Sequence, residues 1–224
     1  MKLLRRLLYS FAVVGLCSGA FGNVSGSEST TNDHLEPPDE RFEPMYRKLL
    51  ARRLFITPAN YVRVVDLPSP ASVGESTVAI YSKPDKPDQV FITCTRAARN
   101  LYYAAFSDDP NFPKDPPMKI ARFDAVFPKP VAKTIGEGVR RMLAETHPRT
   151  KGNLIILHGT EIEFSVEDRP GPTIRGLLTP YAKGKNATAL RRLTHLLKLY
   201  CEAKPTSLPA LARKIEAQAS QLTR

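Results

Sequence analysis

Three carboxylates and one histidine lie within ten residues of each other in the stretch "HGTEIEFSVE" at 158–167. Side chains of these types are common general acids and bases. Glu161 and Glu163 would lie about 7 Å apart on one strand face, and the carboxyl groups of inverting glycosidases are roughly 6.5 to 9.5 Å apart. A glycosidase pair faces inward across the sugar, whereas neighbours on one strand face point the same way. We therefore expect Glu161, Glu163 and Glu167 to form a solvated strand face and not a catalytic pair.

The apolar residues of the same stretch alternate with these carboxylates. Ile162, Phe164 and Val166 recur at every second position, which is the period of a half-buried β-strand. The following "DRPGP" is a turn sequence, and "TIRGLL" at 173–178 can return as a second strand. The stretch therefore predicts a hairpin with one apolar face and one wet, acidic face.

Templates for metal and nucleophilic chemistry fit the chain poorly. The histidines include no pair spaced for zinc, and the sequence has no phosphate-binding glycine loop and no nucleophile elbow, so we expect no metal and no cofactor. One catalytic alternative stays open, because nucleophile and base can meet in space without any fixed spacing in sequence. In that alternative, Cys94 or a serine is the nucleophile, with His147 or His158 as its base.

A basic turn is a second place where a ligand could bind. The sequence "TRAARN" at 95–100 places two arginines beside a pair of tyrosines. Guanidinium groups bind carboxylates and phosphates well. Arg96, Arg99 and Tyr102 are therefore the candidate binding residues, and an ordinary basic turn is the alternative.

The first residues have the order of a secretory signal peptide. Three basic residues precede an apolar run at 7–16, and small residues follow it. We predict a signal peptide over 1–22, cut before Asn23, and an exported protein that is periplasmic or extracellular. The apolar run is shorter than the roughly 20 residues that span a bilayer, so we do not expect an integral membrane protein. An uncleaved anchor and a lipid on Cys17 are the alternatives.

Removal of the signal peptide lowers the formal net charge from +11 to +8, because it carries three basic residues and no acidic ones. This charge favours attraction to anionic surfaces, and we expect no specific nucleic-acid partner. Residues 23–38 are polar, lack periodicity and end in two prolines. They predict a disordered linker with His34 exposed to solvent. We assign 39–224 to a single domain.

Two cysteines, Cys94 and Cys201, remain in the mature chain. Disulfides persist in the compartments to which exported proteins go, so these two can form one. Cys94 shares a strand face with Val90 and Ile92, which predicts that it is buried. The alternative is that each cysteine is a separately buried thiol.

Periodicity and turn residues predict six strands and four helices. The expected strands are 61–67, 76–82, 89–95, 100–106, 161–167 and 173–178. The expected helices are 43–55, 130–147, 189–203 with its cap at Asn186 or Thr188, and 207–222.

The first of these helices is amphipathic and basic. Tyr46, Leu49 and Leu50 lie on its apolar side, and basic residues cover much of the remaining surface. Such a helix either contacts a membrane surface or packs on the fold with a solvated basic face, and the second interpretation is favoured.

These elements predict a single α+β domain, with an antiparallel sheet of about six strands packed by helices. The leading functional hypothesis is an exported, non-catalytic protein that binds a partner or an envelope component. The first alternative is an envelope or secreted hydrolase, whose cleft would gather His158, Glu161 and a serine or cysteine. The second alternative is non-specific binding to an anionic polymer or membrane surface, which would depend steeply on salt.

The last 90 residues or so carry a weak sequence resemblance. The chain shows "RRMLAETHPR", then "HGTEIEFSVE", then a strand with a glycine, a "TP" pair and a leucine-rich helix. This order resembles small exported bacterial proteins of unknown function. The resemblance implies an exported bacterial protein and brings no activity and no site residues. Glycosylation sequons begin at Asn23 and Asn186, so a eukaryotic secreted protein is the alternative.

Overall fold

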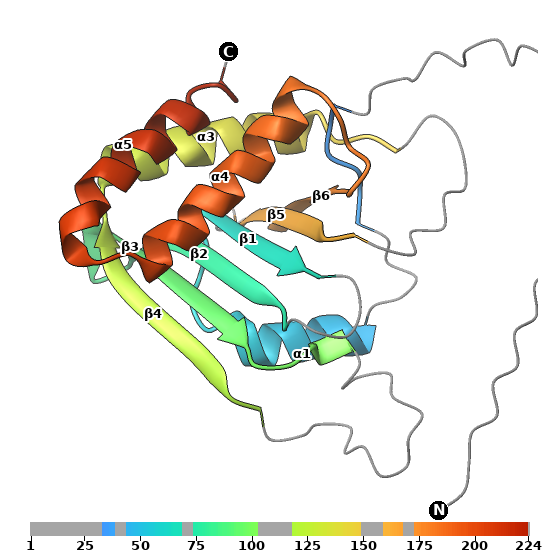
Figure 1. Ribbon diagram of the computed structural model, residues 1–224, viewed down its shortest axis with the longest axis horizontal. Coiled ribbons are helices and arrows are strands. Elements are labelled where there is room, and N and C mark those ends of the chain that lie inside the picture. Colours follow the sequence, from blue (N-terminus) through green and yellow to red (C-terminus); the bar gives the residue numbers. More distant parts are fainter. Residues whose placement is uncertain are drawn as a thin grey trace, which may run out of the picture. The chain divides into compact units, whose positions relative to one another are not determined.

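The computed structural model describes residues 33–38, 44–68, 74–102, 118–148, 159–167 and 173–223 (Figure 1). These residues belong to one compact unit, Thr31–Arg224. Six strands form one antiparallel sheet in the order β4-β3-β2-β1-β5-β6. The predicted α+β class, with an antiparallel sheet of about six strands packed by helices, is confirmed.

The observed elements follow the predicted order, with one strand replaced. The strands are β1 (Val62–Leu67), β2 (Ser76–Lys83), β3 (Lys86–Ala97), β4 (Ile120–Phe127), β5 (Glu161–Glu167) and β6 (Thr173–Leu178). The helices are α1 (Pro44–Leu54), α3 (Lys129–Ala144), α4 (Lys185–Glu202) and α5 (Leu208–Ala219), with a short 3-10 helix η2 (Pro205–Ser207) before α5. Among the described elements, no helix combines the length and the apolar content required to cross a membrane.

The strand predicted at 100–106 is wrong for the part that the structure describes. Leu101 and Tyr102 are helical, and 103–106 lie outside the described residues. The outer strand is instead β4, from a segment for which no element is predicted. Alternate residues of β4 are exposed on this edge of the sheet, so its sequence "IARFDAVF" lacks the strong apolar pattern of an inner strand.

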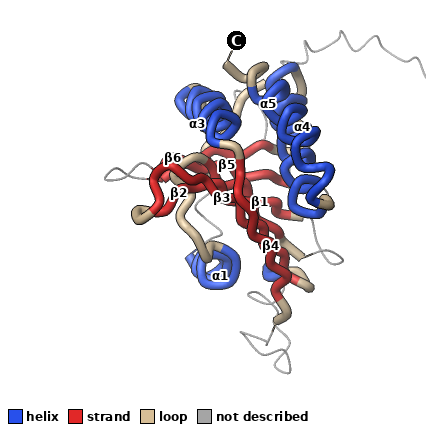
Figure 2. The backbone as a smooth tube through the Cα atoms, turned by 90° about the vertical axis from the view of Figure 1, so that its left-hand side faces the viewer, coloured by secondary structure: helices blue, strands red, loops and turns tan. Residues whose placement is uncertain are grey.

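The two sides of the sheet are packed by different helices. On one side, residues such as Val64, Ile80 and Ile92 contact α3, α4 and α5 in the main core. Helix α1 packs on the other side, in a smaller cluster that includes Ala97 and Leu101. Figure 2 shows α1 by itself and the other three long helices grouped together. Because α1 covers part of the second side, that side is not a fully wet face.

Residues 33–38 belong to the predicted disordered linker, but they pack on the fold, and we call them the N-terminal clip. Leu35 is completely buried in the main core. The backbones of Glu36 and Leu177 exchange two hydrogen bonds of 2.7 and 2.8 Å, which extend the sheet beyond β6. The linker prediction is therefore wrong for the clip, whereas residues 23–32 lie outside the described residues. The contacts that order the clip come from the far end of the chain, so local composition does not reveal them.

The clip also caps α4. The predicted caps, Asn186 and Thr188, are wrong, because both lie inside the helix. The Asp33 carboxylate instead accepts a 2.8 Å hydrogen bond from the backbone N–H of Ala187 in the first turn. The residue before the helix, Gly184, has φ +127°, which favours glycine, and any Cβ there would overlap the Asp33 side chain.

A pair of histidines joins the clip to the end of α3. His34 is half-buried and not freely solvated, and its ring centroid lies 3.5 Å from that of His147. Burial of His34, and next its electrostatic interaction with His147, lower the pKa of His34 below its usual 6.5, while Glu36 and Asp33 oppose this shift. The docked clip therefore favours the neutral form of His34.

This pair should make stability sensitive to mild acid. The unfolded chain protonates His34 at a higher pH than the folded chain does, so the free energy of unfolding should decrease as pH falls below 6.5. Urea unfolding of the wild type and of His34→Asn at several pH values measures this. The variant should lose less stability than the wild type between about pH 7 and pH 5. An identical loss in the two proteins would contradict the assignment of acid sensitivity to this pair.

Candidate ligand-binding cleft

The carboxylates of β5 do not form the solvated face that their alternation predicts. Glu163 and Ser165 are buried, and Glu163 forms an ion pair with Arg47 of α1. The second hydrogen bond of this pair joins Arg47 Nη1 to Glu163 Oε1 at 3.0 Å. The prediction of a wet acidic face is therefore wrong for Glu163, because α1 lies over that side of the sheet. Glu161 and Glu167 are half-buried.

Glu167 also takes part in a contact that holds the fold together. It forms a 2.9 Å ion pair with Arg63 of β1, whose guanidinium lies 4.2 Å from the ring centroid of Phe55. The same guanidinium donates a 2.6 Å hydrogen bond to the carbonyl of Thr57. Burial lowers the pKa of Arg63, and Glu167 opposes this by its charge and its hydrogen bond. These groups fix the segment after α1 to the sheet and do not converge on an open site.

The cysteine–histidine pair considered for catalysis is not formed with His147. Cys94 is joined to Cys201 in a disulfide, with a Cα–Cα separation of 6.1 Å. Its sulfur is therefore not a free nucleophile, and His147 contacts His34. The other proposed base, His158, lies outside the described residues.

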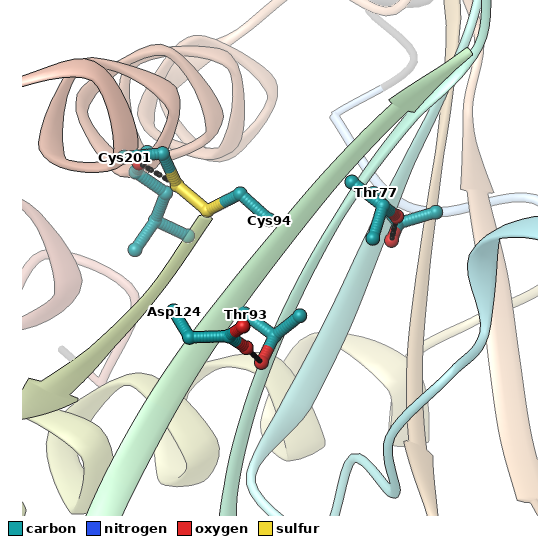
Figure 3. The surroundings of a disulfide bond; sticks show 7 residues. Thr77, Thr93, Cys94, Asp124 and Cys201 are labelled. Carbon is teal, nitrogen blue, oxygen red and sulfur yellow. Dashed lines mark hydrogen bonds between the residues drawn. A yellow bond between two sulfur atoms is a disulfide. The ribbon is translucent and has the colours of Figure 1, made fainter. Parts of the chain in front are cut away.

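The disulfide lines a cleft of about 360 Å³, whose two walls are the last turns of α4 and one end of the sheet. This volume is in the range of sites that bind small molecules. Figure 3 shows Cys201 reaching from α4 to Cys94 on β3. The separation of the two Cα atoms lies within the usual range for disulfides, so the bond ties the two walls together.

The strand register determines the floor of the cleft. The outer row of residues runs across β4, β3, β2 and β1 and consists of Ala121, Arg96, Ser76 and Asp66. The inner row, two residues further into the sheet, consists of Phe123, Cys94 and Val78. Gly74 lies at the edge, where a Cβ would overlap the carbonyl of Ala97, so the backbone comes close here. The floor therefore has a polar outer part and an apolar inner part.

Two of the cations that line the cleft are already paired. Lys198 of α4 forms an ion pair with Asp66 of β1 and so closes one side of the cleft. Arg122 of β4 binds Asp124 through two hydrogen bonds of 2.5 and 3.0 Å. Hydrogen bonding to Asp124 raises the pKa of Arg122. Both cations therefore have much of their charge balanced within the protein.

Arg96 differs from these two cations. It is exposed at the floor of the cleft, and within the described part of the chain no carboxylate forms an ion pair with it. The carboxylate of Glu202 also lines the cleft without an ion pair to a described residue. An exposed guanidinium without an ion-pair partner, such as that of Arg96, can donate two parallel hydrogen bonds to a carboxylate, sulfonate or phosphate group.

The structure separates the three predicted binding residues. Arg96 lines the cleft. Tyr102 lies beside α1, where its ring centroid is 5.5 Å from that of Tyr46, and Arg99 is exposed and does not line the cleft. The alternation of β3 explains the separation of Arg96 from α1, because Arg96 shares the side of Cys94, whereas Ala97 faces α1.

No sequence motif marks Asp66, Arg122 or Lys198 as site residues. They lie in segments that are far from Arg96 in the chain and that carry no motif. A correct strand register would have placed Asp66 and Arg96 in one row, but the register depends on pairings that the sequence leaves open. For Lys198 the only sequence signal is its place off the buried stripe of α4.

The described lining of the cleft offers charges, one hydroxyl group and apolar surface. Ser76 presents its hydroxyl on the cleft side of the sheet, whereas the hydroxyls of Thr77 and Thr95 are buried on the α1 side, where they bond each other and the carbonyl of Leu54. No histidine among the described residues lines the cleft. In the same described ranges, no group of three or more histidine, cysteine or carboxylate side chains is placed to hold a metal ion. Comparisons with protein-family models, curated proteins and solved structures find no match. The resemblance to small exported bacterial proteins therefore stays a prediction.

Proposed function

We propose that this chain is an exported binding protein whose cleft holds an anionic small molecule, or the anionic end of an envelope component. The observation that carries the proposal is Arg96, an exposed guanidinium at the floor of an open cleft without an ion-pair partner in the described chain. Binding sites commonly combine apolar walls with a few polar groups that fix the ligand's orientation. The two rows of the floor have this composition.

The charges around the cleft favour a ligand with one negative group and an apolar body. A carboxylate, sulfonate or phosphate ester can bind Arg96, while Phe123, Val78 and the disulfide provide apolar contact. Glu202 also lines the cleft, and its negative charge disfavours a polyanion. These charges support a singly charged amphiphilic ligand over nucleic acid or an anionic polymer.

Export is part of the proposal and is supported by two features of the chain. The first is the signal pattern of residues 1–22, and the second is the Cys94–Cys201 disulfide, since such bonds persist in oxidising compartments. The described lining groups hold charges and donate hydrogen bonds, which is why binding is proposed and no reaction is assigned.

Titration with 1-anilinonaphthalene-8-sulfonate tests the cleft. This fluorescent probe carries one sulfonate on an aromatic body and therefore matches the proposed ligand class. Arg96→Ala should weaken binding of the probe about tenfold or more, because a hydrogen bond to a charged group contributes about 1.5 to 3 kcal/mol. The dissociation constant from the fluorescence titration is the measured quantity.

Arg99→Ala is the matched control, because Arg99 is exposed three residues further along and does not line the cleft. It should bind the probe as the wild type does. Equal affinity of the wild type and Arg96→Ala would refute the proposed site, and an equal loss in both variants would show that net charge, and not the cleft, attracts the probe.

A further inference from the structure

Exposed apolar and basic side chains gather around α1, on the side of the sheet that faces away from the cleft. Met45, in the first turn, is 58% exposed, and Ile56, two residues after the helix, is 43% exposed. Lys48 and Arg52 are exposed between them. Tyr102 is exposed beside the helix, where it packs on Tyr46. We call these five exposed residues, Met45, Lys48, Arg52, Ile56 and Tyr102, the α1 surface.

The geometry of α1 makes this surface continuous. Met45, Lys48 and Arg52 are spaced by three and four residues, which places them on one side of a helix. The opposite side, with Tyr46, Leu49, Leu50 and Leu54, is buried in the smaller core cluster. An eleven-residue helix is about 16 Å long, so apolar groups lie near both ends with cations between them.

The charge of the α1 surface has one sign. Helix α1 contains no acidic residue. Glu163, which lies beneath the helix, is buried and paired with Arg47, and Glu75, which accepts a hydrogen bond from the Tyr46 hydroxyl, is also buried. The five residues that define the α1 surface therefore carry only positive charge. The α1 surface is also separate from the cleft, since α1 packs on the side of the sheet opposite α4.

We infer that the α1 surface docks on an anionic phospholipid surface. Cations attract anionic head groups, and exposed methionine, isoleucine and tyrosine side chains at the same level can enter the interface between head groups and acyl chains. An acidic protein or a nucleic acid would use the cations but would not require the apolar side chains at both ends of the helix. The inference is independent of the ligand in the cleft, and it gives the basic helix a partner of defined chemistry.

Vesicle co-sedimentation tests this inference. The protein is used as the expressing cell processes it, with its N terminus determined by mass spectrometry. Partition is measured into phosphatidylcholine vesicles with and without about 30% phosphatidylglycerol, and the ratio of the two partition coefficients is the readout. Residues outside the α1 surface are the same in the wild type and in the α1 double variant. The double variant Lys48→Glu/Ile56→Ser should lower this ratio roughly 25-fold, since it changes the charge by two units and each unit near an anionic surface contributes roughly a factor of five.

The matched control is Arg192→Glu/Leu199→Ser on α4. It also replaces one exposed cation and one exposed apolar side chain. Arg192 is exposed, and Leu199, seven residues later on the same helix, is 39% exposed. The control should keep the wild-type ratio. Equal partition of the wild type into both kinds of vesicle, or no partition into either, would overturn the inference. The same loss in both double variants would also overturn it, because net charge alone would then explain the binding.

Discussion

Loss of the Cys94–Cys201 disulfide is expected to lower the free energy of unfolding by up to about 4 to 5 kcal/mol. The bond joins residues separated by 107 positions, and so it restricts a large part of the unfolded chain. The fold itself should survive, because α4 remains attached through the buried side chains of Leu193 and Leu197. The last turn of α4 is also held by the ion pair between Lys198 and Asp66.

Urea unfolding of the wild type and of Cys94→Ala/Cys201→Ala measures this effect. The double variant is preferred to single variants because it leaves no free thiol. Alkylation of the unreduced, denatured wild type provides the control, since Cys94 and Cys201 should take up no label before reduction. Labelling of both cysteines without a reductant would contradict the disulfide. An unchanged unfolding midpoint in the double variant would contradict its contribution to stability.

The same variant also tests whether the disulfide shapes the cleft. Cys94 and Cys201 both line it, so their removal should weaken binding of the sulfonated probe even where the protein remains folded. The effect on probe affinity is separated from the effect on stability by titrating the probe under conditions in which the double variant is fully folded. Arg96→Ala provides the comparison, because it should lower the affinity for the probe with little effect on stability.

Local pattern was sufficient to predict β5 but not its surroundings. The alternation of Ile162, Phe164 and Val166 correctly predicts a strand whose apolar side faces the core. It cannot show that the other side is covered by α1, because the partner of Glu163 is 116 residues away in sequence. A buried carboxylate and a solvated one have the same spacing along the strand. The difference lies in a tertiary contact and not in the strand itself.

The dependence on tertiary contacts also explains which residues of the cleft could be predicted from the sequence. Arg96 was predicted as a binding residue because two arginines close together in a predicted turn are a local sequence signal. The pairing of Cys94 with Cys201 was open to prediction because only two cysteines remain after the predicted signal peptide. Asp66 carries no local signal and Lys198 only its place off the buried stripe of α4, since each is a single charge in an ordinary strand or helix. They become part of the cleft only through strand register and the packing of α4 on the sheet.

Removal of Arg47 is expected to destabilise the fold by about 3 kcal/mol, at the lower end of the range for breaking a buried ion pair. The side chain of Glu163 is only 3% exposed, so Arg47→Ala would leave its charge buried without its main partner. The positive charge of Arg63, with which Glu163 interacts, should offset part of this cost. Glu163→Ala should cost less, because Arg47 is 21% exposed and its guanidinium can turn toward water. Urea unfolding of the two single variants measures the difference.

Two further variants decide whether the burial of Glu163 causes the loss of stability in Arg47→Ala. Arg47→Met/Glu163→Leu removes both charges and should be much closer to the wild type in stability than Arg47→Ala, since apolar side chains often replace a buried pair at little cost. Arg122→Ala breaks the pair with Asp124, in which Arg122 is 49% exposed, and it should cost no more than about 1 kcal/mol. If Arg47→Ala costs no more than Arg122→Ala, α1 does not desolvate Glu163, and the second side of the sheet is wet, as the strand pattern alone predicts. A large cost for Arg47→Ala that the double variant recovers would establish that α1 buries this carboxylate and needs Arg47 to do so.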